Sequence, residues 1–278
     1  MLKLYRPFFS HLFFYIIICF IFFSIYFLNK NITPPPLSIP KQESSININE
    51  TAIRLLSMGN KRLISSLLWV QTLLESDLDH YKNKDLNSWM YLRFRTIIAT
   101  DPNFYEAYYY GGQYLSVIKD DDLGAADIFD RGLLVYPDDL WLNYFSGFHS
   151  YFELGDNLKA YNAYAKIQHN PKMRQFLPYI DSLMARLKAE EGDLEDAYNI
   201  LSTAYEKMAK GYIKEKYAKS LYAIKAQIDL ECLNSHQEKR CELTDWEGRT
   251  YIKNQNDTYI ARKDWQLFRI NKKDRSKK

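Results

Sequence analysis

A pattern that repeats every 34 or 35 residues constrains the fold of this chain more than any single motif. Pro102, Pro137 and Pro171 follow one another at steps of 35 and 34 residues. Self-similarity at a period of this size is typical of a solenoid. One helical hairpin cannot bury its own apolar face, so each repeat has to stack on its neighbours. We therefore expect an all-α stack of hairpins.

Small residues and large rings occupy matching positions within two of these repeats. A pair of small residues lies about ten positions after each proline, an alanine follows the second glycine by 13 residues, and a ring comes four residues later. Small residues allow two helices to approach closely, and the ring fills the gap between them. Proline then ends the second helix, because it lacks the backbone N–H. The residues at these positions are Gly111-Gly112 and Ser146-Gly147, Ala125 and Ala160, and Phe129 and Tyr164.

This spacing resembles that of the tetratricopeptide repeat (TPR), a 34-residue helical hairpin with small residues, an aromatic residue and a proline at fixed positions. The chain departs from the family pattern in two ways. The interval from the small residue to alanine is one residue longer than the usual twelve, and Tyr108 and Asn143 stand where the family has Trp. The resemblance implies a TPR-like solenoid over residues 50–231. Its expected units are about 61–102, 103–137, 138–171 and 178–205, with a capping helix at 212–230.

The N-terminal region contains an apolar run from Phe8 to Leu28, about the 20 residues that a membrane-spanning helix requires. Lys3 and Arg6 precede the run, which favours a cytoplasmic N-terminus. We expect residues 1–30 to form an uncleaved single-pass anchor in the cytoplasmic (inner) membrane, with the C-terminal domain outside the cytoplasm. A cleaved signal peptide is the alternative. The proline-rich segment 31–49 is expected to be an extended linker.

Two cysteines mark the start of a different C-terminal region, predicted to be a Cys loop and β-hairpin at 232–264. Cys232 and Cys241 can form a disulfide, remain free thiols, or bind a metal together with His236, although no fourth ligand is evident. The β-rich runs 250–252 and 258–261 flank a polar turn, which predicts a small hairpin. The Asp-x-x-Gly-x-x-Tyr segment that begins at Asp245 resembles the ending of membrane-anchored bacterial TPR proteins of undefined role. Residues 265–278 form a basic tail, either solvated or bound to anionic lipid.

The sequence contains no motif for catalysis or cofactor binding. It lacks a phosphate loop, a G-x-G-x-x-G, an H-E-x-x-H and a G-x-S-x-G segment. The acidic cluster 120–122 lacks the alternating ligands of a calcium loop and is read as a solvated turn. A net charge of +3 does not favour nucleic acid. No catalytic residue, cofactor, metal site or small-molecule substrate is predicted.

What remains is a surface for a partner. In TPR folds, five positions of the first helix of each unit line a concave groove, and the resemblance carries them onto two helices of this chain. The groove positions implied are Glu106, Tyr109, Gln113, Ser116 and Val117, then Trp141, Tyr144, Phe148, Tyr151 and Phe152. For Phe148 and Phe152, core packing is the alternative. Aromatic residues are common centres of interfaces. We therefore expect a protein or peptide to bind at Glu106, Tyr109, Gln113, Trp141, Tyr144, Phe148 and Tyr151.

These features predict a membrane-anchored, extracytoplasmic TPR-like scaffold, an assembly or accessory factor of an envelope complex. The resemblance implies a bacterial origin. The alternative is an enzyme or accessory subunit acting on envelope glycan or lipid. Glycan hydrolysis needs a pair of carboxylates across the groove, and only Glu106 is acidic among the groove positions. A third possibility is a structural subunit that acts through its membrane helix.

Overall fold

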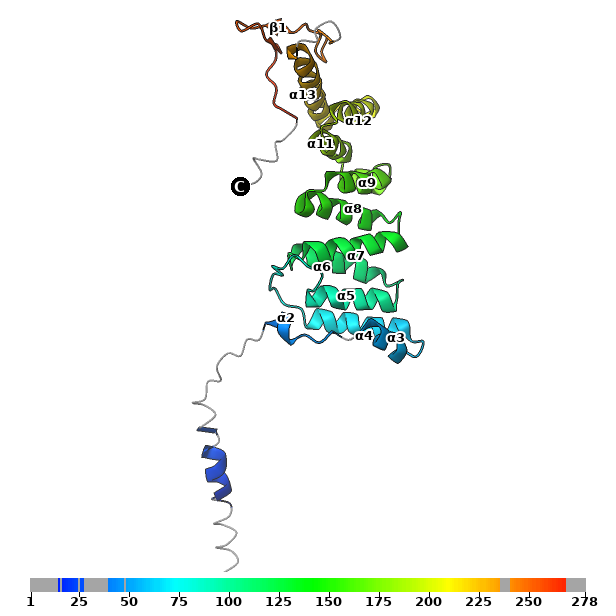
Figure 1. Cartoon of the computed structure of the whole chain (residues 1–278), viewed down its shortest axis with the longest axis vertical. Coiled ribbons are helices and arrows are strands. Elements are labelled where there is room, and N and C mark those ends of the chain that lie inside the picture. The colour runs from blue at the N-terminus through cyan, green and yellow to red at the C-terminus, as the bar shows by residue number, and fades with distance from the viewer. Residues whose placement is uncertain are drawn as a thin grey trace, which may run out of the picture. The chain divides into compact units, whose positions relative to one another are not determined.

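The computed structural model describes residues 15, 17–24, 26–27, 40–47, 49–235 and 241–268. The chain divides into two compact units, Met1–Ser45 and Ile46–Lys278. The second unit is mostly helical, with one small two-stranded sheet near its end (Figure 1). The chain is therefore mostly helical, but the predicted fold class, which includes a transmembrane helix, is contradicted.

The first unit contradicts the predicted transmembrane helix over residues 8–28. In the part of the chain that the structure describes, no helix is both long and apolar enough to cross a membrane. The helical residues described there lie between positions 15 and 27. The other positions of the predicted span, 8–14, 16, 25 and 28, lie outside the described residues. The predicted linker 31–49 is only partly described, and it includes a short helix, α2 (Lys41–Ser44).

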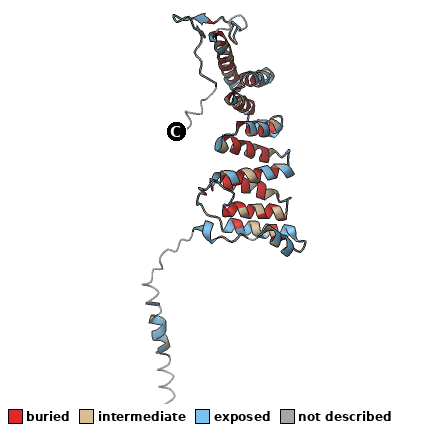
Figure 2. Ribbon diagram, viewed as in Figure 1, coloured by how far each residue is buried: buried red, intermediate tan, exposed pale blue. Residues whose placement is uncertain are grey.

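The second unit is a stack of antiparallel helical hairpins followed by one long helix (Figure 1). A short helix, α3 (Glu50–Leu56), packs beside α5 at the start of the stack. The hairpins are α4 (Lys61–Leu74) with α5 (Trp89–Thr100), α6 (Tyr105–Val117) with α7 (Asp122–Val135), α8 (Leu140–His149) with α9 (Asn157–Ile167), and α11 (Ile180–Glu191) with α12 (Leu194–Lys207). The long helix α13 (Tyr212–Asn234) packs on α12. Buried residues gather between successive helices (Figure 2).

The expected packing of small residues against rings is present in two hairpins. Phe129 of α7 lies against Gly112 of α6 so closely that a Cβ on Gly112 would be 2.5 Å from the ring. In the next hairpin, a Cβ on Gly147 of α8 would be 3.0 Å from the Tyr164 ring of α9. Both rings are buried. The prediction that glycine allows close approach and that the ring fills the contact is confirmed.

The turns inside three of the four hairpins, α6–α7, α8–α9 and α11–α12, have a common design. A residue in the left-handed conformation is followed by an aspartate that caps the second helix. The cap carboxylate accepts a hydrogen bond from the backbone N–H three residues later, at 2.9, 2.9 and 3.1 Å in the three hairpins. Such caps satisfy a donor that the helix start leaves free. The pairs are Asp120-Asp121, Gly155-Asp156 and Gly192-Asp193.

The extra residue in two of the repeats is accommodated just before this turn. In hairpins α6–α7 and α8–α9, the N–H of the capping aspartate donates to the carbonyl six residues earlier, Asp121 to Leu115 and Asp156 to Ser150. In hairpin α11–α12, Asp193 donates to Lys188, five residues earlier. At the end of α8 the widened turn is π-helical, η1 (Ser150–Leu154). The longer spacing that departs from the TPR pattern therefore produces a wider helix end.

The repeated prolines differ in their roles. Pro102 and Pro137 each follow the end of a second helix by two residues, as expected. Pro171 instead begins an additional short helix, α10 (Pro171–Phe176), at a position where its missing N–H has no cost. The sequence analysis did not predict this helix, which separates the third and fourth hairpins.

The C-terminal region is attached to α13. Cys232 and Cys241 are joined in a disulfide, the first of the three alternatives, while His236 lies outside the described residues. The predicted hairpin is present, with β1 (Ile252–Lys253) antiparallel to β2 (Tyr259–Ile260). Asn234 at the end of α13 exchanges two hydrogen bonds with the backbone of Tyr259, at 3.1 and 2.8 Å. Of the predicted basic tail, only residues 265–268 are described.

Candidate functional site

A connected series of aromatic rings crosses the second unit from α6 over α8 to α10. We call it the aromatic face. On α6 the rings of Tyr105 and Tyr109 stack with centroids 5.7 Å apart. Tyr109 contacts Phe145 of α8 edge-on at 5.5 Å. The members of the aromatic face are Tyr105, Tyr109, Tyr110, Trp141, Tyr144, Phe145 and Phe176.

The additional helix α10 completes this face. Its Phe176 contacts Trp141 at 5.1 Å and Tyr144 at 5.3 Å, in both cases edge to face. Edge-to-face contacts of this kind are favourable beyond the area that they bury. The two ends of the face are accessible to solvent, since Tyr110 is 56% exposed and Phe176 is 53% exposed. The middle of the face, including Trp141 and Tyr144, is half-buried.

An apolar pocket adjoins the α6 end of the face. It is a cavity of about 560 Å³, lined from α4 by Trp69 and Leu73 and from α6 mainly by Tyr110, Gln113 and Val117. Two groove positions from the sequence analysis, Gln113 and Val117, therefore lie here. Clefts of this size with apolar walls are the usual form of ligand and peptide sites. The pocket and the aromatic face share Tyr110, so they form one surface over the first helices of three hairpins.

The structure brings most of the predicted groove residues to this surface. Tyr109, Trp141 and Tyr144 belong to the aromatic face, and the Gln113 side chain donates a hydrogen bond to the Tyr109 carbonyl at 2.9 Å. Glu106 lies 3.6 Å from Arg62 of α4, so its charge is compensated. Phe148 is half-buried against Phe152, with ring centroids 4.5 Å apart.

Tyr151 lies elsewhere than expected. Its side chain is only 2% exposed, and its hydroxyl donates to Glu190 of α11 at 3.1 Å. Ser116 occupies the equivalent position of α6 and is buried too, while the residue after it, Val117, is exposed. This position therefore faces inward in both hairpins, and Phe152, like Val117, is exposed. Tyr151 connects two hairpins and does not line the surface.

Ser116, another predicted groove position, is also buried and belongs to a polar contact between hairpins. His149 of α8 is 2.9 Å from the Asp122 carbonyl through Nε2 and 2.8 Å from the Ser116 hydroxyl through Nδ1. A carbonyl only accepts, so Nε2 carries the proton and Nδ1 accepts from Ser116. Burial lowers the pKa of His149, which keeps the ring neutral.

This arrangement predicts a loss of stability in mild acid. The pKa of His149 is lower in the folded chain than its usual value of about 6.5, so below that pH the unfolded chain binds more protons. Stability is full above about pH 6.5 and decreases as the pH falls. In urea titrations at pH 7.5 and 5.5, His149→Gln should show a smaller decrease than the wild type. The exposed His80→Gln serves as control; an equal decrease in all three proteins would contradict the prediction.

Two phenol groups of the aromatic face, those of Tyr105 and Tyr144, are held in the neutral form by their surroundings. Burial raises the pKa of Tyr144 above its ordinary value, and within the described residues its hydroxyl has no bonded partner. Burial and the nearby charge of Asp139 raise the pKa of Tyr105, whose hydroxyl donates to Asp139 at 3.0 Å. The face can therefore offer apolar contact area together with a phenol donor. No cluster of three His, Cys, Asp or Glu side chains that could hold a metal occurs among the residues described.

The sequence analysis missed four members of the aromatic face, Tyr105, Tyr110, Phe145 and Phe176. Tyr105 is the first residue of α6, directly before the predicted groove position Glu106. Tyr110 and Phe145 each follow a predicted groove position, so the five-position pattern passes over them although their rings are long enough to reach it. Phe176 lies after the closing proline, in a helix that the repeat pattern does not contain. The only available signal was Asn170 directly before Pro171, a combination typical of a helix start.

Comparison of the chain with protein-family models, with curated proteins and with solved structures gave no match. The TPR resemblance therefore rests on the spacing of residues in this sequence. The structure supplies stacked helical hairpins of that period, and membership of the TPR family stays a prediction.

Proposed function

We propose that this chain is a TPR-like scaffold that binds a protein partner on the aromatic face and serves as an assembly or accessory factor of an envelope complex. The observation that supports this proposal most is the unbroken series of rings from Tyr110 to Phe176, with both ends exposed. Large exposed apolar patches mark interaction sites on soluble surfaces. Rings of this kind supply much of the binding energy in interfaces.

The occupant that fits this surface is a peptide segment or helix with apolar side chains. The face crosses three helices and ends in the apolar pocket beside Trp69 and Leu73. A helix laid across such a groove would place residues i, i+4 and i+7 on successive rings. The half-buried Trp141 and Tyr144 would form the centre of the interface, where anchor residues exclude water best.

The proposed location outside the cytoplasm rests on the cysteine pair. Cys232 and Cys241 are bonded to each other, and such bonds persist mainly in oxidising compartments. The bond closes the end of α13 onto the C-terminal hairpin, which makes it a structural element of this region. The proposal does not include a membrane-spanning helix.

Site-specific photocrosslinking in cells tests this function. A photoreactive residue is placed at Tyr110, at Phe176 and, as control, at Leu158 of α9, which is 60% exposed but makes no ring contact. We expect the same protein to be captured from positions 110 and 176, and not from 158. Equal capture from all three positions, or different proteins from 110 and 176, would contradict a single docking surface. Capture of glycan or lipid only would favour the alternative function.

A further inference from the structure

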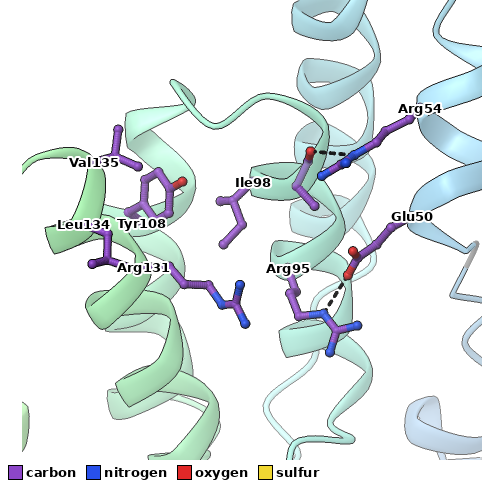
Figure 3. Close-up of a pocket in the computed structure, with 9 residues that line it drawn as sticks. Glu50, Arg54, Arg95, Ile98, Tyr108, Arg131, Leu134 and Val135 are labelled. Carbon is purple, nitrogen blue, oxygen red and sulfur yellow. Dashed lines mark hydrogen bonds and ion pairs between the residues drawn. The ribbon is translucent and has the colours of Figure 1, made fainter.

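A second pocket, separate from the aromatic face, is lined by three arginines from three different helices. Arg54 of α3, Arg95 of α5 and Arg131 of α7 border a cavity of about 430 Å³ (Figure 3). In Figure 3 the guanidinium group of Arg131 extends across the opening toward that of Arg95. The cavity has the size of a small-molecule site. No function assigned above uses it.

Each of these arginines is held in place through its Nε atom. Arg54 donates from Nε to the Ala99 carbonyl at 2.9 Å. Arg95 and Arg131 donate from Nε to Glu50 and Asp127, both at 2.6 Å. A guanidinium group has five N–H donors, so this anchoring leaves terminal amino groups for another acceptor, although Arg95 also interacts with the Tyr91 hydroxyl. Fixing the side chains in advance reduces the entropy that a ligand must overcome.

The pocket has an excess of positive charge. Three guanidinium groups face two carboxylates, Glu50 and Asp127, and Asp127 also accepts a hydrogen bond from Tyr91 at 2.9 Å. Asp127 raises the pKa of Arg131, while Arg95 acts in the opposite direction because the two cations repel each other. An anion bound between them would relieve that repulsion and could accept two parallel hydrogen bonds from each guanidinium.

The remaining wall of the pocket is apolar. Ile98 lies at the back, the Tyr108 ring borders one side, and Leu134 and Val135 of α7 form the rim. Leu134 is largely exposed, although it is a leucine. The hydroxyl of Tyr108 is already bonded to the Pro102 carbonyl at 3.0 Å, so this residue contributes its ring face. A ligand that fits the whole cavity has both an anionic group and an apolar part.

We propose that this arginine pocket binds an oxyanion, a phosphate or carboxylate group, attached to an apolar moiety. The anionic group bonds the terminal amino groups of Arg54, Arg95 and Arg131, and the apolar part lies on Ile98, Leu134 and Val135. The same chemistry occurs in small organic phosphates and in phosphomonoester lipid headgroups. The pocket is formed by α3, α5 and α7 with Tyr108 of α6, and it shares no residue with the aromatic face, so its ligand does not compete with a partner on that face.

The test measures binding of phenyl phosphate, a soluble probe, to the full chain by isothermal titration calorimetry. Inorganic phosphate reports the contribution of the anion alone. Vesicles of phosphatidylcholine with and without phosphatidic acid report binding of a lipid headgroup. Arg131→Gln removes one terminal donor pair. Arg262→Gln is the control, because Arg262 is an exposed arginine outside the pocket that is likewise held through Nε, here by the Thr250 carbonyl at 3.0 Å.

We expect phenyl phosphate or the phosphatidic acid vesicles to bind saturably, and the probe that binds identifies the source. Arg131→Gln should weaken that binding about tenfold, the usual loss for a hydrogen bond to a charged group, while Arg262→Gln leaves it unchanged. Arg131→Lys, which keeps the charge, should restore part of it. Absence of saturable binding, or binding that Arg131→Gln does not weaken while its melting temperature is retained, would overturn the proposal. Inorganic phosphate binding as tightly as phenyl phosphate would overturn the role of the apolar wall.

Discussion

Phe129→Ala is expected to lower the free energy of unfolding by about 3–5 kcal/mol, the usual range for removing a fully buried ring. Phe129 is 1% exposed and fills the contact between α6 and α7 at Gly112. The loss is large because a stack of hairpins can close such a cavity only by moving one helix against another. Urea titration of the full chain, followed by circular dichroism, measures it. Leu134→Ala on the same helix, largely exposed, should change stability by no more than about 0.5 kcal/mol.

Gly112, which the Phe129 ring lies against, allows a second test of the same contact. Gly112→Ala places a methyl group where the Phe129 ring lies and should destabilise by about 1–3 kcal/mol. In a Phe129→Leu background the same glycine change should have a smaller effect, because the smaller side chain leaves space. If the two substitutions changed the free energy of unfolding additively, Gly112 would not be required for the close packing of the Phe129 ring.

The second large effect is expected at a buried ion pair between the first two hairpins. Asp77, in the loop after α4, forms an ion pair with Lys119, whose side chain is 4% exposed. Asp77→Ala leaves that ammonium group buried without its carboxylate, which typically lowers the free energy of unfolding by about 3–5 kcal/mol. Chemical unfolding measures the loss. The exposed neighbour Asp79→Ala should have little effect.

A double substitution separates the charge from the loop geometry. Lys119→Met combined with Asp77→Ala removes both charges and should be more stable than Asp77→Ala alone. If the double variant were as unstable as the single one, the loop itself, and not the unpaired lysine, would explain the loss. The Tyr81 N–H donates to the Lys119 carbonyl at 2.6 Å. This backbone hydrogen bond involves neither of the substituted side chains.

The local chemistry of each repeat could be predicted from the sequence, because it depends on residues a fixed distance apart. Gly112 and Phe129 lie on the two helices of one hairpin, so their spacing in the sequence alone implies their contact. The C-terminal hairpin was predictable for the same reason, since its strands 252–253 and 259–260 are β-rich and nearly adjacent. In each case, the interaction lies within one supersecondary unit.

Features that depend on the path of the backbone could not be predicted in this way. The sequence did not show that Tyr151, like Ser116 at the equivalent position of α6, faces inward at the end of its helix and reaches Glu190 of the next hairpin. Phe176 reaches Trp141 only because α10 folds back after Pro171. The transmembrane helix predicted from the apolar run at the N-terminus is contradicted, since no helix in the described residues is both long and apolar enough to cross a membrane.

The arginine pocket was invisible in the sequence for a related reason. Arg54, Arg95 and Arg131 are about forty positions apart and belong to no motif. They meet because α3 and α7 both pack against α5. Contacts between second helices of successive hairpins follow from the stacking geometry, which the repeat period alone does not specify.

The most direct test of the proposed docking surface asks whether its two exposed ends, Tyr110 and Phe176, bind the same partner. A photoreactive residue at position 110 is combined with Phe176→Ala or, as control, with Leu158→Ala, and the yield of the crosslinked product is compared. Both substituted side chains are more than half exposed, so neither change should unfold the chain. We predict that Phe176→Ala lowers the yield at least severalfold while Leu158→Ala leaves it unchanged. An unchanged yield in both variants would contradict the account, because the rings on α6 and α10 would then not serve the same partner.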